Sequence, residues 1–378
     1  MRASTLVLLA AICVTSVAGA QGALSTEGLG YPYGQISARA EGAGGSLADF
    51  DALSLVSPSS VAGVGSPALF FQYSPEFRRV TAGSGTAKTM TSRFPLVSGV
   101  LPVGQNWVLA LSSSSFLDRS YETSLVRQQN VGAITDTVDV TEQNKVLGAI
   151  NDVRLALAWA SGPMFRFGVG AHVFAGSNRV SISEIFPDST KFLSTVETDE
   201  ISYAGFAASA GLEFHPSRTI GFALSGRKGG DLRAEKGDTA IGKGKIPDHY
   251  SASITYDGIT GATISARAAH DSWSSLTPLS STGIQAFDGW DTSLGAEVTG
   301  PRLLQRIIIV RAGARKRTLP FGFNGQKVSE TSFMGGLGAP LARDRASIDF
   351  AFQRASRSSA GPVKETGYIF SFGLRVTP

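Results

Sequence analysis

The residues of this sequence that are best suited to chemistry do not form the patterns that catalytic or cofactor sites need. Residues 237–244 read GDTAIGKG, which falls short of a phosphate-binding loop because no Ser or Thr follows the lysine. His270, Asp271 and Ser272 are adjacent in sequence, which does not make a catalytic triad. The histidines lack the spacing of metal ligands: His172, His215, His249 and His270. The sequence therefore predicts no enzyme, no metal and no cofactor.

One pattern does suggest a binding site for a small amphipathic molecule. Ile307 and Ile309 share their parity with Arg311 and Arg315, so in an extended strand all four side chains lie on one face. An apolar pocket that ends in a cation suits a lipid with a carboxylate head. The alternative is that these arginines are ordinary constituents of a polar lumen.

The start of the chain indicates export. Arg2, the apolar run from Leu6 to Val14 and the small residues 18–20 form the pattern of a cleaved signal peptide, residues 1–20. Cys13 is the only cysteine and lies inside this peptide, so the mature chain has no disulfide, thiol or cysteine–metal chemistry. The net charge of +4 is modest, and we expect no nucleic-acid partner.

The connections between candidate strands favour a membrane β-barrel over a soluble sandwich. The mature sequence has no run of about 18 apolar residues, so no transmembrane helix is expected. We count fourteen candidate strands from residue 68 onward, and short and long connections alternate between them. Outer-membrane barrels have short turns at one end and long loops at the other. The short connections are 102–105, 161–163, 215–218, 258–261, 299–304 and 342–345, and the long ones are 119–145, 179–200, 227–247, 273–287, 319–328 and 357–364.

The side chains of these strands alternate between two faces. In residues 165–173, for example, Phe165, Phe167 and Val169 share one parity, while Arg166 and Gly168 have the other. A charge facing lipid near the midplane costs about 2–4 kcal/mol, so the charged parity should face the lumen. We therefore predict inward side chains for Arg154, Arg166, Glu213, Arg267, Asp291, Glu297, Asp349 and Arg375.

Aromatic residues near strand ends fit the two interface girdles of a barrel. They are Trp107, Trp159, Phe214, Tyr250, Trp290 and Tyr368. A soluble all-β protein with a packed core remains the alternative. Counts of 12 or 16 strands also remain open, because residues 262–270 and 333–341 are weakly patterned.

The N-terminal part of the mature chain resembles a known family. Residues 34–59 read GQISARAEGAGGSLADFDALSLVSPS, which is similar to the N-terminal segment of the long-chain fatty acid outer-membrane transporters and their relatives, including the barrel subunit of the type IX secretion system. Ser57-Pro58-Ser59 replaces the family's Asn-Pro-Ala, although Pro58 keeps the fixed turn. Shorter similarities follow at residues 94–107, 151–155 and 246–251.

The resemblance implies an all-β fold: a transmembrane antiparallel β-barrel of 14 strands, with an N-terminal plug in its lumen, in the bacterial outer membrane. We assign residues 21–66 to the plug and residues 67–378 to the barrel. The implied function is passive uptake of hydrophobic small molecules such as long-chain fatty acids. Two roles are open for the plug: it only seals the lumen, or it seals the lumen and also gates it. The residues expected to serve either role are Arg39, Gly42, Gly44, Gly45, Asp49 and Pro58.

The resemblance also suggests a lateral opening toward the membrane. Four serines, Ser112, Ser113, Ser114 and Ser115, interrupt an apolar strand and would mark a kink; the alternative is an ordinary strand end. The expected partners are outer-membrane lipid and a hydrophobic ligand. The alternative function is a secretion or assembly component that binds partner proteins, because residues 32–35 are slightly more similar to that branch.

Overall fold

The computed structural model describes residues 24–83, 85–130, 137–188, 191–280, 284–303, 306–341 and 345–377. The predicted signal peptide, residues 1–20, lies outside them. Within this described part, no helix is long and apolar enough to cross a membrane.

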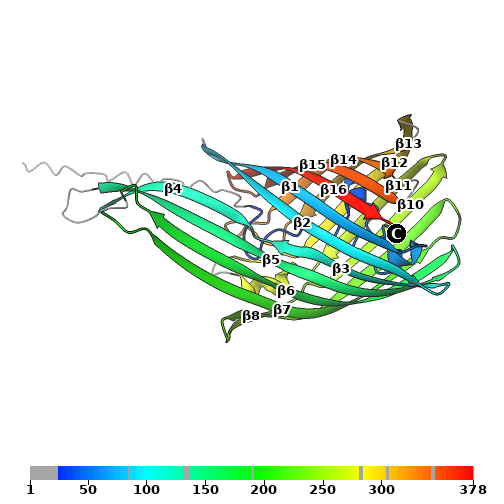
Figure 1. Cartoon of the computed structure of the whole chain (residues 1–378), viewed down its shortest axis with the longest axis horizontal. Coiled ribbons are helices and arrows are strands. Elements are labelled where there is room, and N and C mark those ends of the chain that lie inside the picture. The colour runs from blue at the N-terminus through cyan, green and yellow to red at the C-terminus, as the bar shows by residue number, and fades with distance from the viewer. Residues whose placement is uncertain are drawn as a thin grey trace, which may run out of the picture.

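The described residues form one antiparallel sheet that closes into a barrel (Figure 1). Fourteen of its strands complete the ring, because β10 pairs with both β11 and β8. These are β1 (Ala68–Ala82), β2 (Gly85–Val103), β3 (Trp107–Asp118), β5 (Thr137–Ser161), β6 (Phe165–Ile185), β7 (Thr195–Phe214), β8 (Ile220–Lys236), β10 (His249–Ile259), β11 (Ala262–Asp271), β12 (Gly289–Leu303), β13 (Arg306–Thr318), β14 (Ser329–Leu341), β15 (Ala346–Ser358) and β16 (Lys364–Val376). The predicted count of fourteen is confirmed.

Two further strands lie outside the ring. β4 (Tyr121–Asn130) pairs only with β5, and β9 (Thr239–Lys245) pairs only with β8. The long connections predicted at 119–145, 179–200 and 227–247 are therefore largely strand and not loop. Their backbones hydrogen-bond in hairpins that continue β5 to β8 beyond the rest of the wall (Figure 1). Neither face of such an extension meets lipid, so its strands need no alternation of apolar and polar residues. The polar, weakly alternating sequence therefore did not predict these hairpins.

The connection between β1 and β2 was also missed. Ala82 pairs with Gly85 across a tight turn, in which Gly83 has φ +58°. This turn lies at the long-connection end of the barrel, so it is an exception to the rule that this end carries only long connections.

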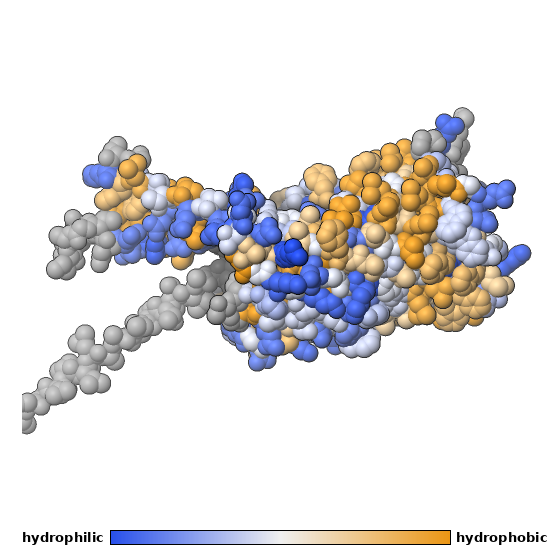
Figure 2. All heavy atoms as spheres, turned by 90° about the horizontal axis from the view of Figure 1, so that it is seen from below, coloured by the Kyte–Doolittle hydropathy of each residue, from blue (hydrophilic) through white to orange (hydrophobic). Residues whose placement is uncertain are grey.

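The two faces of the wall separate charge from hydrocarbon as predicted. Leu155, Phe206 and Leu294 are at least half exposed on the outer face, while Arg154 and Glu213 are buried on the inner face. All eight predicted inward charges are buried or half-buried. Apolar residues cover the outside toward the tight-turn end, and hydrophilic residues gather toward the extended strands (Figure 2).

The lumen contains the N-terminal segment and is not an open pore. We call described residues 24–66 the plug segment; it includes the short helix α1 (Ala38–Gly42) and the 3-10 helix η1 (Ser59–Gly63). α1 packs against β13 to β16, and η1 packs against β3, β5, β6 and β7, which lie elsewhere around the ring. A third helical element, η2 (Trp273–Leu279), follows β11 and packs against β9.

Candidate functional site

The plug segment is positioned first by its own turns. The Ser37 hydroxyl caps α1 by accepting a hydrogen bond from the Ala40 N–H at 3.2 Å, and it donates to Asp51. Gly44 and Gly45 follow the helix with φ values of +73° and +82°, a region that favours glycine. A Cβ on Gly44 would also lie 2.9 Å from the backbone nitrogen of Ala314 on the wall. The predicted glycines therefore allow a sharp turn and a close approach.

Gly42 and Pro58 make the same kind of close contact on other strands. A Cβ on Gly42 would lie 3.0 Å from the Cα of Gly336 on β14. Pro58 lies against Gly168 and Gly211 on β6 and β7, where an added Cβ would meet it at 2.4 and 3.0 Å. Small residues on both surfaces let the plug backbone lie directly on the wall.

Asp49 is the most extensively bonded carboxylate of the plug segment. It is fully buried and accepts hydrogen bonds from Ser225 at 3.0 Å, Ser251 at 2.7 Å and the Nε of Arg267 at 2.9 Å, and also from Ser253. Burial alone would raise its pKa, but Arg267 and the serine hydroxyls hold the pKa of Asp49 below its ordinary value. Asp49 is thus an ionised anchor to β8, β10 and β11.

Arg39, the other charged plug residue predicted, contacts a different strand. Its guanidinium donates to Glu297 on β12 at 3.0 and 3.1 Å and lies 3.8 Å from Asp51. The Arg39 side chain is about 40% exposed, so this pair is a weaker anchor than Asp49.

A second anchor, which the sequence analysis did not identify, holds the start of the plug segment. The Tyr31 ring lies between two guanidinium groups, with Arg317 at 4.7 Å and Arg357 at 4.3 Å from its centroid. Its hydroxyl donates to Glu330 at 2.7 Å. Burial raises the pKa of Tyr31 to about 12, so the phenol stays a neutral donor. Arg357 also pairs with Glu76, at 2.8 Å.

The hydrogen-bonded wall is interrupted between β2 and β3. Their pairing runs from Val103↔Trp107 to Leu96↔Ser114, and in the described residues it does not continue beyond that point. Beyond it, β2 pairs only with β1, whereas the end of β3 pairs with β5. We call this interruption the β2–β3 seam.

Two contacts close the seam from the lumen side. Arg93 on β2 forms a buried ion pair with Asp118 on β3. The plug segment forms a short antiparallel bridge to the same strand, with Tyr31 N donating to Asp118 O at 2.8 Å and Asp118 N donating to Tyr31 O at 2.9 Å. Gly34 lies between the two strand edges: a Cβ there would be 2.8 Å from the Pro95 carbonyl oxygen and 2.9 Å from that of Ser115.

The four predicted serines lie at this seam. Ser112 and Ser114 are buried and face the lumen, Ser113 faces outward, and Ser114 is the last residue of β3 that pairs with β2. A register irregularity interrupts the pairing of β3 with β5 between Ser115 and Leu117, next to the end of the β2–β3 ladder. The position of the seam therefore coincides with the predicted serines, while a passage through it remains a prediction.

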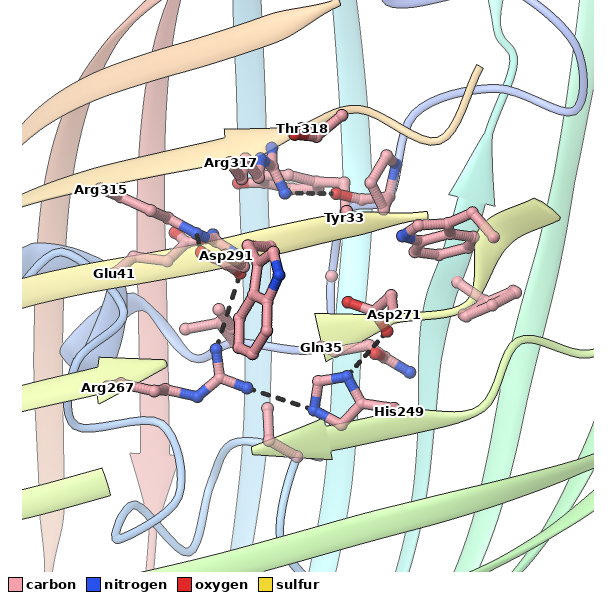
Figure 3. A pocket seen from close by; sticks show the side chains of 18 of the residues that line it. Tyr33, Gln35, Glu41, His249, Arg267, Asp271, Asp291, Arg315, Arg317 and Thr318 are labelled. Atoms are coloured by element: carbon pink, nitrogen blue, oxygen red, sulfur yellow. Dashed lines mark hydrogen bonds and ion pairs between the residues drawn. The ribbon is translucent and has the colours of Figure 1, made fainter. Parts of the chain in front are cut away.

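A small cavity of about 70 Å³ lies between the plug segment and the wall (Figure 3). A ladder of charged side chains forms one side of it: Asp271 accepts from His249 at 2.7 Å, Arg267 donates to His249 at 3.3 Å, and Asp291 pairs with both Arg267 and Arg315. Because Nε2 of His249 accepts from Arg267, Nδ1 is the protonated nitrogen that donates to Asp271.

Glu41, on α1, also lines this cavity and has no ion-pair partner among those found in the described residues. Burial raises the pKa of Glu41 to about 7, although hydroxyl groups and two arginines partly oppose the shift. Ligand sites usually enclose roughly 300–1,000 Å³, so this cavity is too small for a fatty acid unless the plug segment moves.

The residues predicted to bind a substrate are divided between two cavities. Arg315 lines the small cavity and pairs with Asp291. Ile309 and Arg311 line a second cavity of about 430 Å³ on the tight-turn side of the plug segment, which Arg39 also lines. Ile307 lines neither of these cavities and is about 40% exposed. Arg311 is paired with Glu297 at 2.6 Å and Asp349 at 2.7 Å. Substrate binding by these residues stays a prediction.

An apolar cluster lies on the other side of the plug segment, with the Arg227 guanidinium over the Phe116 ring at 4.9 Å. Phe116 packs against Phe174 at 4.9 Å and against Trp273 of η2 at 5.4 Å, and Leu276 and Ile246 join the same buried cluster. Water-filled barrels have polar lumens, so an apolar cluster in the lumen suits a hydrophobic cargo.

His172 lies at the centre of a hydrogen-bonded chain that the sequence analysis missed. Its Nδ1 contacts Asp152 at 2.8 Å and its Nε2 contacts Ser209 at 2.8 Å, from three adjacent strands. The spacing resembles that of an acid–histidine–serine relay. Neither the 70 Å³ nor the 430 Å³ cavity is lined by His172 or Ser209. The hydrogen bond from His172 gives the buried Asp152 carboxylate a partner.

No protein-family model and no curated protein matches this sequence. Solved structures do match it. The crystal structure of a Pseudomonas aeruginosa FadL homologue matches with a TM-score of 0.63 at 12% identity, over 93% of this chain and 99% of that chain. CymD, a monoaromatic hydrocarbon channel, matches with a TM-score of 0.55 at 11% identity, over 91% of this chain and 97% of that chain.

The P. putida toluene transporter TodX gives the same values as CymD: a TM-score of 0.55, 11% identity, and coverage of 91% and 97%. Structural matches at sequence identities this low establish the fold of the chain but not the molecule that it transports. The chain therefore has the β-barrel fold of the FadL homologue, the hydrocarbon channel and the toluene transporter, which is the fold that the resemblance of residues 34–59 predicted.

Proposed function

We propose that this protein is an outer-membrane channel for the passive uptake of hydrophobic small molecules of the long-chain fatty acid type. The solved structures that share its fold include a FadL homologue, a hydrocarbon channel and a toluene transporter. The lumen supports the same function, because a cluster of apolar side chains that includes Phe116 and Trp273 lies inside it.

The β2–β3 seam is the observation that carries the proposal. A barrel wall is normally closed by a continuous ladder, since unpaired backbone groups are costly in lipid. Here the ladder ends at Leu96↔Ser114, and a plug residue, Tyr31, supplies the next backbone partner to β3. Withdrawal of residues 31–34 would open the wall sideways.

A sideways exit suits a hydrophobic cargo energetically. Each methylene group that passes from the lumen into bilayer hydrocarbon and not into water saves about 0.8 kcal/mol. We infer that the cargo crosses the apolar cluster, displaces the seam part of the plug segment and leaves between β2 and β3. Arg39, Gly42, Gly44, Gly45, Asp49 and Pro58 would hold the remainder of the plug in place, and Ile309 and Arg311 would line the space below it.

A cross-link across the seam tests this proposal. In a Cys13-free background, Pro95→Cys and Ser115→Cys would place thiols on the two edges that Gly34 separates. We expect oxidation to reduce uptake of a fluorescent fatty acid into cells, and a reducing agent to restore it. The control pair is Leu101→Cys with Leu109→Cys, which already face each other in the paired part of β2 and β3. Equal uptake by the oxidised and reduced seam variant would reject the lateral exit.

The secretion-component alternative is not favoured. The structures named above are a FadL homologue, a hydrocarbon channel and a toluene transporter, and none of them is named as a secretion component.

A further inference from the structure

The outer face of the barrel carries a groove that the transport pathway does not use. Its volume is about 740 Å³, and its lining residues come from β6, β7, β8, β10, β11 and β12. Its lining is mostly apolar and includes Leu212, Leu224, Tyr250 and Trp290. The volume falls within the range of roughly 300–1,000 Å³ that ligand pockets occupy.

The groove results from an unusual distribution of large and small residues in two neighbouring rows of the wall. One row runs across the strands from β7 to β12. It begins with two small residues, Ala210 and Gly226, and continues with three large ones, Tyr250, His270 and Trp290. In the next row toward the tight turns the order is reversed. This row begins on β6 with the large residues Phe167, Leu212 and Leu224 and continues with the small residues Ala252 and Ala268. The small residues form a floor, and the large residues stand on either side of it.

The depth of the groove places it in one leaflet. Tyr250 lies about 9 residues along β10 from the tight turn at Ile259, which at about 3.3 Å per residue and a tilt of about 40° is about 23 Å. The apolar band of a barrel is about 25 Å tall, so Tyr250, His270 and Trp290 lie at its far edge, the aromatic girdle at the long-connection end. The groove lies just below this girdle, within the outer leaflet.

A cluster of cations lies immediately beyond the groove. Lys228 is two residues along β8 from Gly226 on the same outer face, and it donates to Asp248 at 2.5 Å. Lys245 shares this carboxylate at 3.2 Å. Two lysines with one aspartate leave an excess positive charge, and the Lys228 and Lys245 side chains are about 67% and 42% exposed.

We propose that this groove is a specific site for an anionic lipid of the outer leaflet, with its phosphate at Lys228 and Lys245 and an acyl chain over Ala210, Gly226, Ala252 and Ala268. The residues directly below Lys228 on this face, Gly226 and its neighbour Ala210, are small, and the Tyr250 ring borders Gly226 on its other side. A cation above an apolar surface at the membrane interface selects negatively charged head groups. The proposal requires the membrane-spanning fold and does not depend on transport.

Trp290 provides a direct probe, since it lines the groove and is exposed. In the variant Trp107→Phe/Trp159→Phe, the remaining Trp273 is buried inside the barrel, so brominated lipids should quench only Trp290. The protein would be reconstituted in phosphatidylcholine vesicles that contain increasing fractions of brominated phosphatidylglycerol, or of brominated phosphatidylcholine as the reference. We expect a several-fold lower half-quenching fraction for phosphatidylglycerol.

Two sets of variants identify the source of this preference. Lys228→Gln/Lys245→Gln should abolish it, and Ala252→Leu/Ala268→Leu should weaken quenching by both lipids. Lys88→Gln and Ala312→Leu are the controls, because both residues are exposed outside the groove, and they should change nothing. A variant with Trp107 as its only lipid-facing tryptophan should show no lipid preference.

Equal quenching by the two lipids, or a preference that survives loss of both lysines, would overturn the proposal. Stronger quenching by a brominated fatty acid than by phosphatidylglycerol at equal fraction would also overturn it. The migration of unheated samples on gels would confirm that each variant is a folded barrel.

Discussion

The plug segment meets the two sides of the barrel in different ways. On the β8–β11 side, the wall is a continuous ladder, and Asp49 binds to its inner face through three serines and Arg267. On the β2–β3 side, the ladder is interrupted, and the plug backbone at Tyr31 replaces part of it. The Asp49 contact is made to a wall that is already fully hydrogen-bonded, whereas the Tyr31 contact supplies backbone hydrogen bonds that the wall lacks.

This difference indicates which part of the plug segment moves. Detaching Asp49 would leave a buried charge and several hydroxyls without partners. Moving residues 31–34 breaks the backbone bridge to Asp118 and the contacts of Tyr31 with Glu330, Arg317 and Arg357, but those three charged groups remain paired with one another. We therefore expect the Asp49 side to stay fixed while the seam side opens.

Asp49→Ala should have the largest effect. It leaves the buried Arg267 without its 2.9 Å partner, and removal of one member of a buried ion pair costs about 3–5 kcal/mol. We expect a lower unfolding temperature in gel-shift assays and rapid proteolysis of the plug segment. Asp238→Ala, at an exposed turn, is the control. An unchanged unfolding temperature would show that the β8–β11 contact is not the main anchor.

Tyr31→Phe should affect only the seam side. The ring remains between Arg317 and Arg357, but the hydrogen bond to Glu330 is lost, and bonds to charged groups contribute about 1.5–3 kcal/mol. Hydrogen exchange should increase at residues 30–36 and stay constant around residue 49. Equal increases at both positions would mean that the plug segment moves as one body.

The fold could be predicted because lipid imposes a strict rule on the sequence. Every second residue of a membrane strand must be apolar, so the parity of residues such as Leu155 and Arg154 defined strands and faces together. Asp49 was also predictable, and inward parity at Ser225, Ser251 and Ser253 could have identified its partners.

The seam could not be predicted in the same way. Arg93 and Asp118 are distant in sequence, and their contact depends on where β2 and β3 separate. Pro95 was one available signal, because a proline within a strand removes a ladder donor and indicates an edge. The extension formed by β4 and β5 lies beyond the apolar part of the wall, so its sequence does not show the alternation of apolar and polar residues that identified the other strands.

Gly34→Ala tests the seam by crowding it. The added Cβ would lie 2.8 Å from the Pro95 carbonyl oxygen, at a φ of +107°, and strain of this kind costs about 1–3 kcal/mol. We expect faster uptake of a fluorescent fatty acid. Gly104→Ala is a matched control, because it also has a positive φ, +75°, but nothing lies within 4 Å of its added Cβ. Equal uptake by both variants would assign the effect to backbone strain alone and not to the seam.

The smallest effect should be a pH dependence that originates at Glu41. Burial raises the pKa of Glu41 to about 7, above the ordinary value of 4.5. Between about pH 4.5 and pH 7, Glu41 is therefore protonated when the plug is closed, whereas a solvated carboxyl group would be ionised. The closed state is therefore most stable below about pH 4.5, loses stability as the pH rises toward 7, and changes no further above it.

Uptake by the natural protein should accordingly rise modestly between pH 5 and about pH 7.5. In Glu41→Gln, which stays neutral, uptake should remain at its low-pH level throughout, while Glu235→Gln at an exposed position should behave as the natural protein does. A pH response that persisted in Glu41→Gln would show that another group causes it and that opening leaves the surroundings of Glu41 unchanged. Because Glu41 lies on α1, the division between a fixed and a moving side would then lie between Gly34 and Ala38.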